Sequence, residues 1–151
     1  MTPILGSHSI RTIWLLLFLA LFVSCAGTKP DSIGRFAECP EKPNCISSKS
    51  STPSQMASPL IYEGPSTEAK AKLISVIESM PRTQISVNKD NFLHIEFTSL
   101  IFRFVDDVEF YFNEPRIIHF RSASRVGHSD LGVNRNRIEE IRHLFTKDSL
   151  K

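Results

Sequence analysis

The fold is decided by residues 101–112, IFRFVDDVEFYF, and by RIIHFRSAS at residues 116–124, which follows after a short turn. Apolar side chains alternate with polar ones in both stretches. Because successive side chains of a strand point to opposite faces, this alternation predicts two strands that share one apolar face. The turn at residues 113–115 predicts antiparallel pairing. The expected core-facing side chains are Phe102, Phe104, Val108, Phe110, Phe112, Ile118 and Phe120.

The flanking sequence adds strands and helices to this pair. FLHIEFTS at residues 92–99 has the same period of two, with His94 and Glu96 on the outward face, and residues 84–87 form a shorter strand. Helical patterns run from residue 65 to Met80, where Pro81 ends the helix, and from Asn134 or Asn136 to Phe145. We therefore expect an α+β fold: an antiparallel sheet of about four strands with one face covered by two helices and the other face open.

The amino terminus has the pattern of an export signal. Residues 13–23 are an apolar run of 11 residues after Arg11, whereas a membrane-spanning helix needs about 20. The following FVSCAG resembles the lipobox of bacterial lipoproteins, although Phe22 stands where Leu is commonest. We expect cleavage before Cys25 and its modification with acyl chains such as palmitate, against plain cleavage or an uncleaved anchor. Ala26 favours the outer membrane if the host is diderm.

Residues 26–59 are rich in Ser, Pro, Lys and Thr and have no sustained hydrophobic period, which predicts an extended, solvated tether. Within this range Cys39 and Cys45 are the remaining thiols once Cys25 carries lipid, and an oxidising envelope favours a disulfide between them. The expected organisation is a signal peptide (1–24), a lipidated cysteine, tether and cysteine loop (25–59) and an α+β domain (60–151).

The balance of charges argues against nucleic acid as a partner, and missing motifs argue against several kinds of site. The 18 Lys and Arg residues nearly balance 16 Asp and Glu residues, which gives no basic surface for nucleic acid. Neither a zinc-ligand spacing nor a cofactor motif is present, so we expect no cofactor. A metal site built from Asp106, Asp107, Glu109 and His119 lacks a calcium-loop spacing, and a hydrolase using Ser122 or Ser124 with His128 and Asp130 lacks a nucleophile elbow.

Two strings carry a family resemblance: CPEKPNCISS at residues 39–48, and FRFVDDVEF at residues 102–110 followed by RSASRVGHSDLGVNRNR at residues 121–137. Together they resemble the domain-of-unknown-function family 1499 of bacterial envelope and plastid-related proteins. The resemblance covers residues 39–145. It implies the domain limits and an envelope setting but no reaction.

The segment from Arg121 to Arg137 is the main candidate site. Two glycines precede a helix there, and backbone N–H groups with guanidinium forks can bind an anion or carboxylate. The alternative is that the same charges tie the loop to the sheet through buried ion pairs. The candidate ligand-binding residues are Arg121, Ser124, Arg125, Asp130, Asn134 and Arg135.

Asp106 falls in the apolar register of its strand, where an unpaired carboxylate is costly to bury. We expect it to pair with an arginine, first of all Arg125, or to lie at a bulge with Asp107. The leading functional hypothesis is a non-catalytic envelope lipoprotein that binds a protein partner or an anionic small ligand. The alternative is a small hydrolase or transferase that uses Asp106, Asp107 and the arginines.

Overall fold

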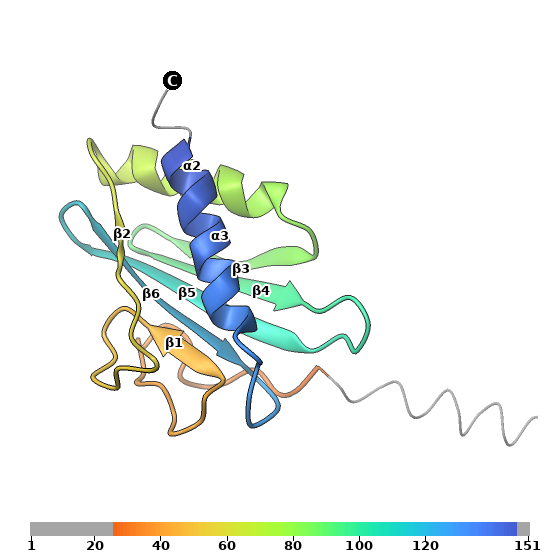
Figure 1. Cartoon of the computed structure of the whole chain (residues 1–151). Helices are drawn as coiled ribbons and strands as arrows, with labels where there is room; N and C mark the ends of the chain where they lie inside the picture. Colours follow the sequence, from red (N-terminus) through yellow and green to blue (C-terminus); the bar gives the residue numbers. More distant parts are fainter. Residues whose placement is uncertain (1–25, 148–151) are drawn as a thin grey trace, which may run out of the picture.

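The structure is a computed structural model, and it describes residues 26–147. The predicted signal peptide and Cys25 therefore lie outside the described residues. Within the described range no helix is both long and apolar enough to cross a membrane. The elements are β1 (Cys45–Ser47), β2 (Leu60–Ile61), α2 (Ser66–Ser79), β3 (Thr83–Lys89), β4 (Phe92–Thr98), β5 (Val105–Glu114), β6 (Ile117–Ser124) and α3 (Val133–Lys147) (Figure 1).

Six strands form one antiparallel sheet in the order β1-β6-β5-β4-β3, with β2 also paired to β6. The α+β class is confirmed, whereas the expected count of about four strands is too low. The two additional strands come from the short edge pairings Cys45↔Ala123 and Leu60↔Ile118. Strands of three and two residues show too little alternation to be detected, yet they satisfy backbone groups along β6.

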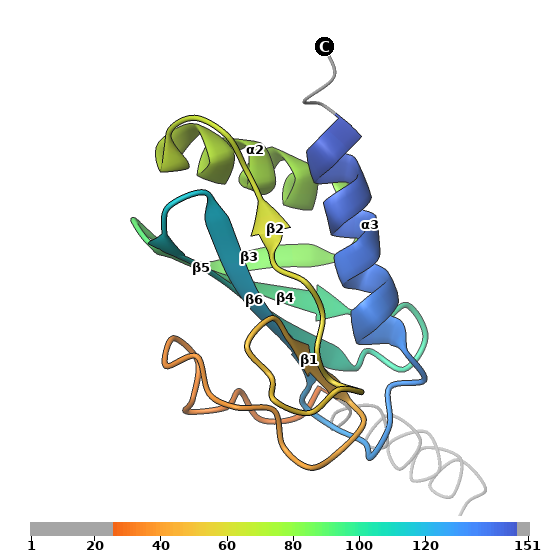
Figure 2. The ribbon, with the colours of Figure 1, turned by 60° about the vertical axis from the view of Figure 1, so that its left-hand side comes forward.

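Both helices pack on the same face of the sheet, as expected (Figure 2). Helix α2 ends at Ser79 because Pro81 disfavours helical geometry at the residue before it. Apolar side chains from α2, α3 and the sheet form one core under the helices. Its fully buried members include Leu73, Ile77, Leu93, Ile95, Phe110, Phe120, Ile138 and Ile141.

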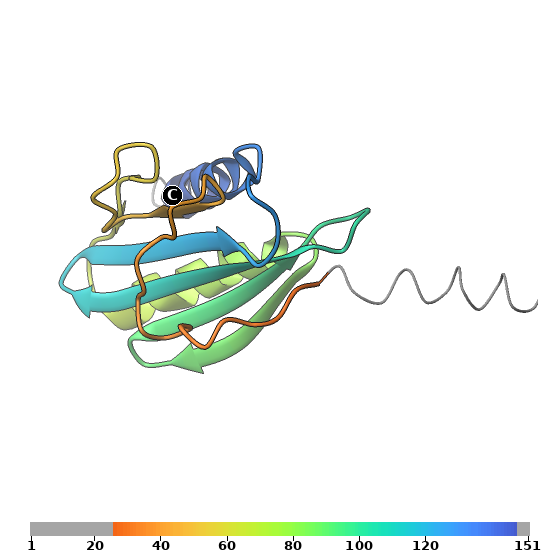
Figure 3. The same cartoon turned by 90° about the horizontal axis from the view of Figure 1, so that it is seen from below.

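Residues 26–38 cross the opposite face of the sheet, which the sequence predicted to be open (Figure 3). We call residues 26–38 the covering segment. The Gly34 N–H donates to Glu109 Oε2 at 2.7 Å, and the Phe36 ring stacks on Tyr111 at 4.2 Å. The segment covers this face because its backbone and aromatic groups have polar and aromatic partners there. A mainly apolar sequence in the covering segment was therefore not needed for it to pack on the sheet.

The predicted tether is not solvated throughout, although many of its residues are exposed. Asn44, Cys45, Ile46, Ser47, Gln55 and Ala57 are all buried, although they belong to the range expected to be solvated. The predicted disulfide is confirmed: Cys39 and Cys45 are bonded, with 5.6 Å between their Cα atoms. Because Cys45 is in β1, this bond attaches the end of the covering segment to the edge of the sheet.

Strand β5 starts at Val105, four residues later than the alternating pattern suggested. Phe102 and Phe104, expected in the core, are instead exposed in the loop between β4 and β5. The Ser99 N–H donates to the Phe104 carbonyl at 2.8 Å and closes this loop. Alternation alone could not reveal that a turn interrupts it.

Candidate functional site

Asp106 and Asp107 lie on opposite faces of the sheet, as adjacent residues of a strand must. Arg137 of α3 reaches Asp106 Oδ2 through Nη2 at 2.5 Å, so the predicted pairing of Asp106 with Arg125 is wrong. The register explains the error. Ser124 pairs with Asp106 across the strands, and the next residue, Arg125, therefore points to the face of Asp107.

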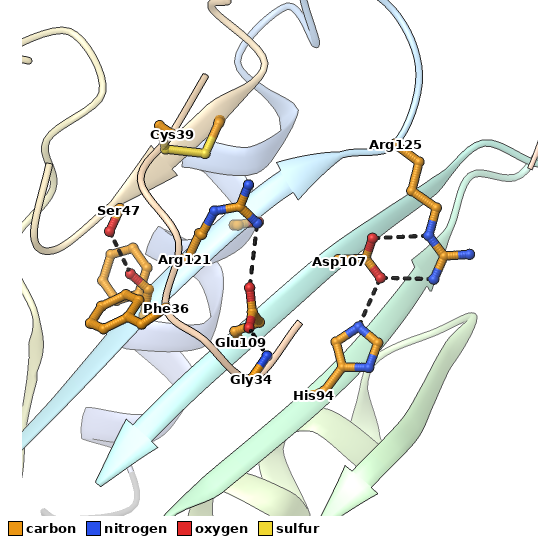
Figure 4. A network of polar contacts seen from close by, with 12 residues as sticks. Gly34, Phe36, Cys39, Ser47, His94, Asp107, Glu109, Arg121 and Arg125 are labelled. Carbon is orange, nitrogen blue, oxygen red and sulfur yellow. Dashed lines mark hydrogen bonds and ion pairs between the residues drawn. A yellow bond between two sulfur atoms is a disulfide. The ribbon is translucent and has the colours of Figure 1, made fainter. Parts of the chain in front are cut away.

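A buried network surrounds Asp107 on the face under the covering segment (Figure 4). Arg125 donates to both carboxylate oxygens, from Nε at 2.9 Å and from Nη2 at 2.7 Å. His94 Nε2 lies 2.7 Å from Oδ1, and Arg125 Nη2 also reaches Glu96 at 2.8 Å. Burial alone would raise the pKa of Asp107, but hydrogen bonds from Arg125 and His94 outweigh burial and lower it. The hydrogen bond to Asp107 raises the pKa of Arg125.

Three side chains of this network, His94, Glu96 and Asp107, have the composition of a metal site. Ligand atoms of His94, Glu96 and Asp107 lie within 4.8 Å of one another. The Arg125 guanidinium, however, bridges the two carboxylates and takes the space that a cation would need. These residues can hold a metal ion only if Arg125 moves away, so their geometry fits an ion-pair network better.

Glu109 is the centre of a second buried cluster on this face (Figure 4). Its Oε1 accepts from Arg121 Nη1 at 3.3 Å, and its Oε2 accepts from the Tyr111 hydroxyl and from the Gly34 N–H. Burial and the neighbouring carboxylate raise the pKa of Tyr111. This cluster fastens the covering segment to the sheet.

The six residues of the predicted anion site do not meet in one place. Arg121 and Arg125 pair with carboxylates under the covering segment. Asn134 is buried between Ser122, Ser124 and the Asn44 carbonyl, on the helix side. Arg135 Nη2 donates to the carbonyl oxygens of Ser54 and Met56.

Asp130 accepts the N–H groups of Gly132 and Asn134 and so caps α3. Ligand binding by the six predicted residues stays a prediction. Their contacts, however, match the alternative in which these side chains tie the loop to the rest of the domain.

The predicted site residues do not include Asn44, His94 or Arg137. Asn44 lies in the predicted tether, yet its Nδ2 donates to the Gly127 carbonyl at 2.9 Å and holds the loop before α3. A signal for His94 was present: polar side chains recur at alternate positions of β4, β5 and β6, so they face one another in a single patch. No local pattern distinguishes Arg137 from the neighbouring arginines.

An open groove lies between the β4–β5 loop and the amino-terminal end of α3, with a volume of about 410 Å³. We call it the loop–α3 groove. Its lining includes apolar side chains and the Asp106–Arg137 ion pair. The Arg137 guanidinium lies 4.7 Å from the centre of the Phe97 ring. Its lining also includes Met80, Pro81, Arg82, Leu100, Val133, Asn136 and Glu140.

A second hollow, of about 450 Å³, lies at Ile61, Tyr62, Lys72 and Phe145. It contains no residue of the predicted sites, and a smaller hollow of about 220 Å³ contains Asp130 and Arg135 of the predicted anion set. Of the two larger hollows the loop–α3 groove, which contains Asp106, is the better candidate.

Comparison with known proteins identifies the domain. The family model described as "Protein of unknown function (DUF1499)" matches residues 35–145, which confirms the resemblance seen in the sequence. No curated protein matches the chain. The matched range begins within the covering segment and ends in α3. It therefore includes both faces of the sheet, the disulfide and the loop–α3 groove.

Proposed function

Since the chain belongs to the DUF1499 family, whose description assigns no activity, we propose from geometry that it is a lipid-anchored binding module of the cell envelope. In this proposal a lipid on Cys25 holds the domain on the membrane, in the outer membrane if the host is diderm. The loop–α3 groove binds a small ligand with an apolar body and an anionic group. The apolar run before Cys25 supports export, and the oxidised Cys39–Cys45 pair is consistent with it.

The observation that carries the binding proposal is the composition of the loop–α3 groove. Binding sites for small molecules are usually hollows with apolar walls and a few converging polar groups. Met80, Phe97, Leu100 and Val133 supply apolar surface. Arg82 is exposed at the same groove, and within residues 26–147 its side chain has one hydrogen-bond partner: its Nε donates to the Thr98 carbonyl at 3.1 Å. Its terminal N–H groups therefore suit a carboxylate, phosphate or sulfonate.

The catalytic alternative has less support from the geometry. Asp106 contacts Arg137 on the helix side, whereas Asp107 contacts Arg125 under the covering segment. Two carboxylates on opposite faces of one strand cannot act on the same substrate atom. A mechanism that uses both therefore has no common site, and the binding module is the proposal we retain.

The test uses 1-anilinonaphthalene-8-sulfonate, a fluorescent anion with an apolar body. Arg82→Glu should weaken its binding about tenfold, because reversing the charge removes a charge-assisted hydrogen bond. Arg116→Glu is the matched control: Arg116 is also exposed and also has a positive φ, 64° against 58° for Arg82, but it lies outside the groove. Equal dissociation constants for the two variants would refute the groove as the binding site.

A further inference from the structure

The loop between β4 and β5 exposes consecutive apolar side chains. Leu100, Ile101 and Phe102 are 69%, 77% and 63% exposed. Two hydrogen bonds close the loop at its base, since the Ser99 N–H donates to the Phe104 carbonyl at 2.8 Å and the Phe104 N–H donates to Ser99 Oγ at 2.9 Å. The closed base holds the apolar tip away from the sheet. Contiguous exposed apolar surface of this kind marks a contact with a partner or a membrane.

The described chain begins at the same end of the domain. Gly27 has a φ of 68°, and a Cβ built on it would lie 2.8 Å from the Arg125 Cβ and from Val126 Cγ1. The Arg125 N–H donates to the Val105 carbonyl at 3.1 Å, and Val105 follows the β4–β5 loop directly. Figures 1 and 3 both show the start of the covering segment on the side to which this loop projects.

Because the covering segment is packed on the sheet, a lipid anchor on Cys25 would set the orientation of the domain relative to the membrane. A long flexible tether would leave the orientation of the domain open. Instead, Gly27 packs on Arg125, Lys29 Nζ lies 3.8 Å from Glu96 Oε1, and Gly34 is bonded to Glu109. Cys25 immediately precedes this packed segment, so acyl chains on it would bring this end of the domain to the bilayer surface.

We propose that the β4–β5 loop inserts Leu100, Ile101 and Phe102 into the bilayer beside the lipid on Cys25. The proposal rests on the lipid anchor of the proposed function, and it adds an orientation and a second membrane contact. Arg103, also exposed and next to the apolar tip, suits the anionic phosphates at headgroup level. Apolar residues at the interface strengthen a single lipid attachment because each buried apolar group adds favourable free energy.

The experiment uses the full lipoprotein, reconstituted in vesicles of phosphatidylethanolamine and phosphatidylglycerol, with and without acyl chains that carry bromine as a quencher. Phe102→Trp places a tryptophan at the tip of the loop. The wild-type protein measures the background fluorescence, which comes from Trp14 if the signal peptide is not cleaved. The matched control is Ile61→Trp. Ile61 is 60% exposed but pairs with Ile117, next to the β5–β6 turn at the other end of the sheet.

We expect Phe102→Trp emission to shift to shorter wavelength and to be quenched by the brominated lipids, with no change in Ile61→Trp. A vesicle-bound protein whose Phe102→Trp emission is unchanged would overturn insertion while leaving the anchor intact. A shift without quenching would mean that the loop contacts a second copy of the chain, and it would also overturn the proposal. Failure of wild type and Cys25→Ser to differ in flotation with vesicles would refute the anchor itself.

Discussion

The two faces of the sheet are both buried, but by different means. Under α2 and α3 the sheet presents apolar side chains such as Phe110 and Phe120, which are fully buried. Under the covering segment it presents His94, Asp107, Glu109 and Arg121, which are buried as well. On the first face burial follows from the removal of apolar surface from water. On the second face the charged groups are buried together because they satisfy one another.

This difference shows that alternation in a strand predicts chemical character and does not predict exposure. The polar set on β4, β5 and β6 looked like the solvent side of an open sheet. Complementary pairs such as Asp107 with Arg125 make it a second buried layer. Such a layer is less tolerant of the loss of one partner than of the loss of both, because the remaining charge is left without compensation.

The largest expected effect is on the helix-covered face. Phe110→Ala should lower the free energy of unfolding by about 4 kcal/mol, because it leaves a cavity in the core. Phe102→Ala, at an exposed phenylalanine of the β4–β5 loop, is the control and should change it by about 0.5 kcal/mol or less. Urea unfolding measures both. Similar losses in the two variants would mean that the face assignments are wrong.

On the polar face Arg125→Ala should cost about 3 kcal/mol, because Asp107 is left buried without its main partner. Adding Asp107→Asn should recover part of this loss, and the double-mutant cycle measures the coupling. Arg103→Ala, at an exposed arginine, should have little effect on unfolding. If Arg125→Ala leaves the melting temperature unchanged, Arg125 does not hold the fold and its interpretation as a structural ion pair fails.

The smallest expected effect is on the pH dependence of unfolding, which should come from the polar face. Because the pKa of Asp107 is lowered in the folded protein, its contribution to stability is present above the unfolded value, about 3.9, and is lost as pH falls through the folded pKa. Urea unfolding at decreasing pH should therefore show a loss that Asp107→Asn reduces. Glu114→Gln is the control: hydrogen bonds from Lys49 and His119 also lower the pKa of Glu114, but its carboxylate is exposed and its ion pairs therefore contribute little. An unchanged acid profile in Asp107→Asn would contradict the prediction.

The candidate site was only partly predictable. Asp106 was correctly expected to need an arginine, but its partner is Arg137 from α3 and not Arg125. The choice depended on which face each side chain takes after β6 ends and on how α3 crosses the sheet. The six residues predicted to bind an anion do not converge, for the same reason: Arg125 and Asn134 are near in sequence but contact side chains on opposite faces of the sheet.

The sequence by itself determined the α+β class, the helix-covered core, the end of α2 before Pro81, the disulfide and membership of the family. These follow from local signals: side-chain period, proline geometry, a pair of thiols and long ordered strings. Tertiary structure alone decided that residues 26–38 cover the second face, that β1 and β2 complete the sheet, and which arginine meets which carboxylate. Those outcomes depend on contacts between residues far apart in the sequence, such as Asn44 with Asn134, which are 90 positions apart, and no local pattern encodes them.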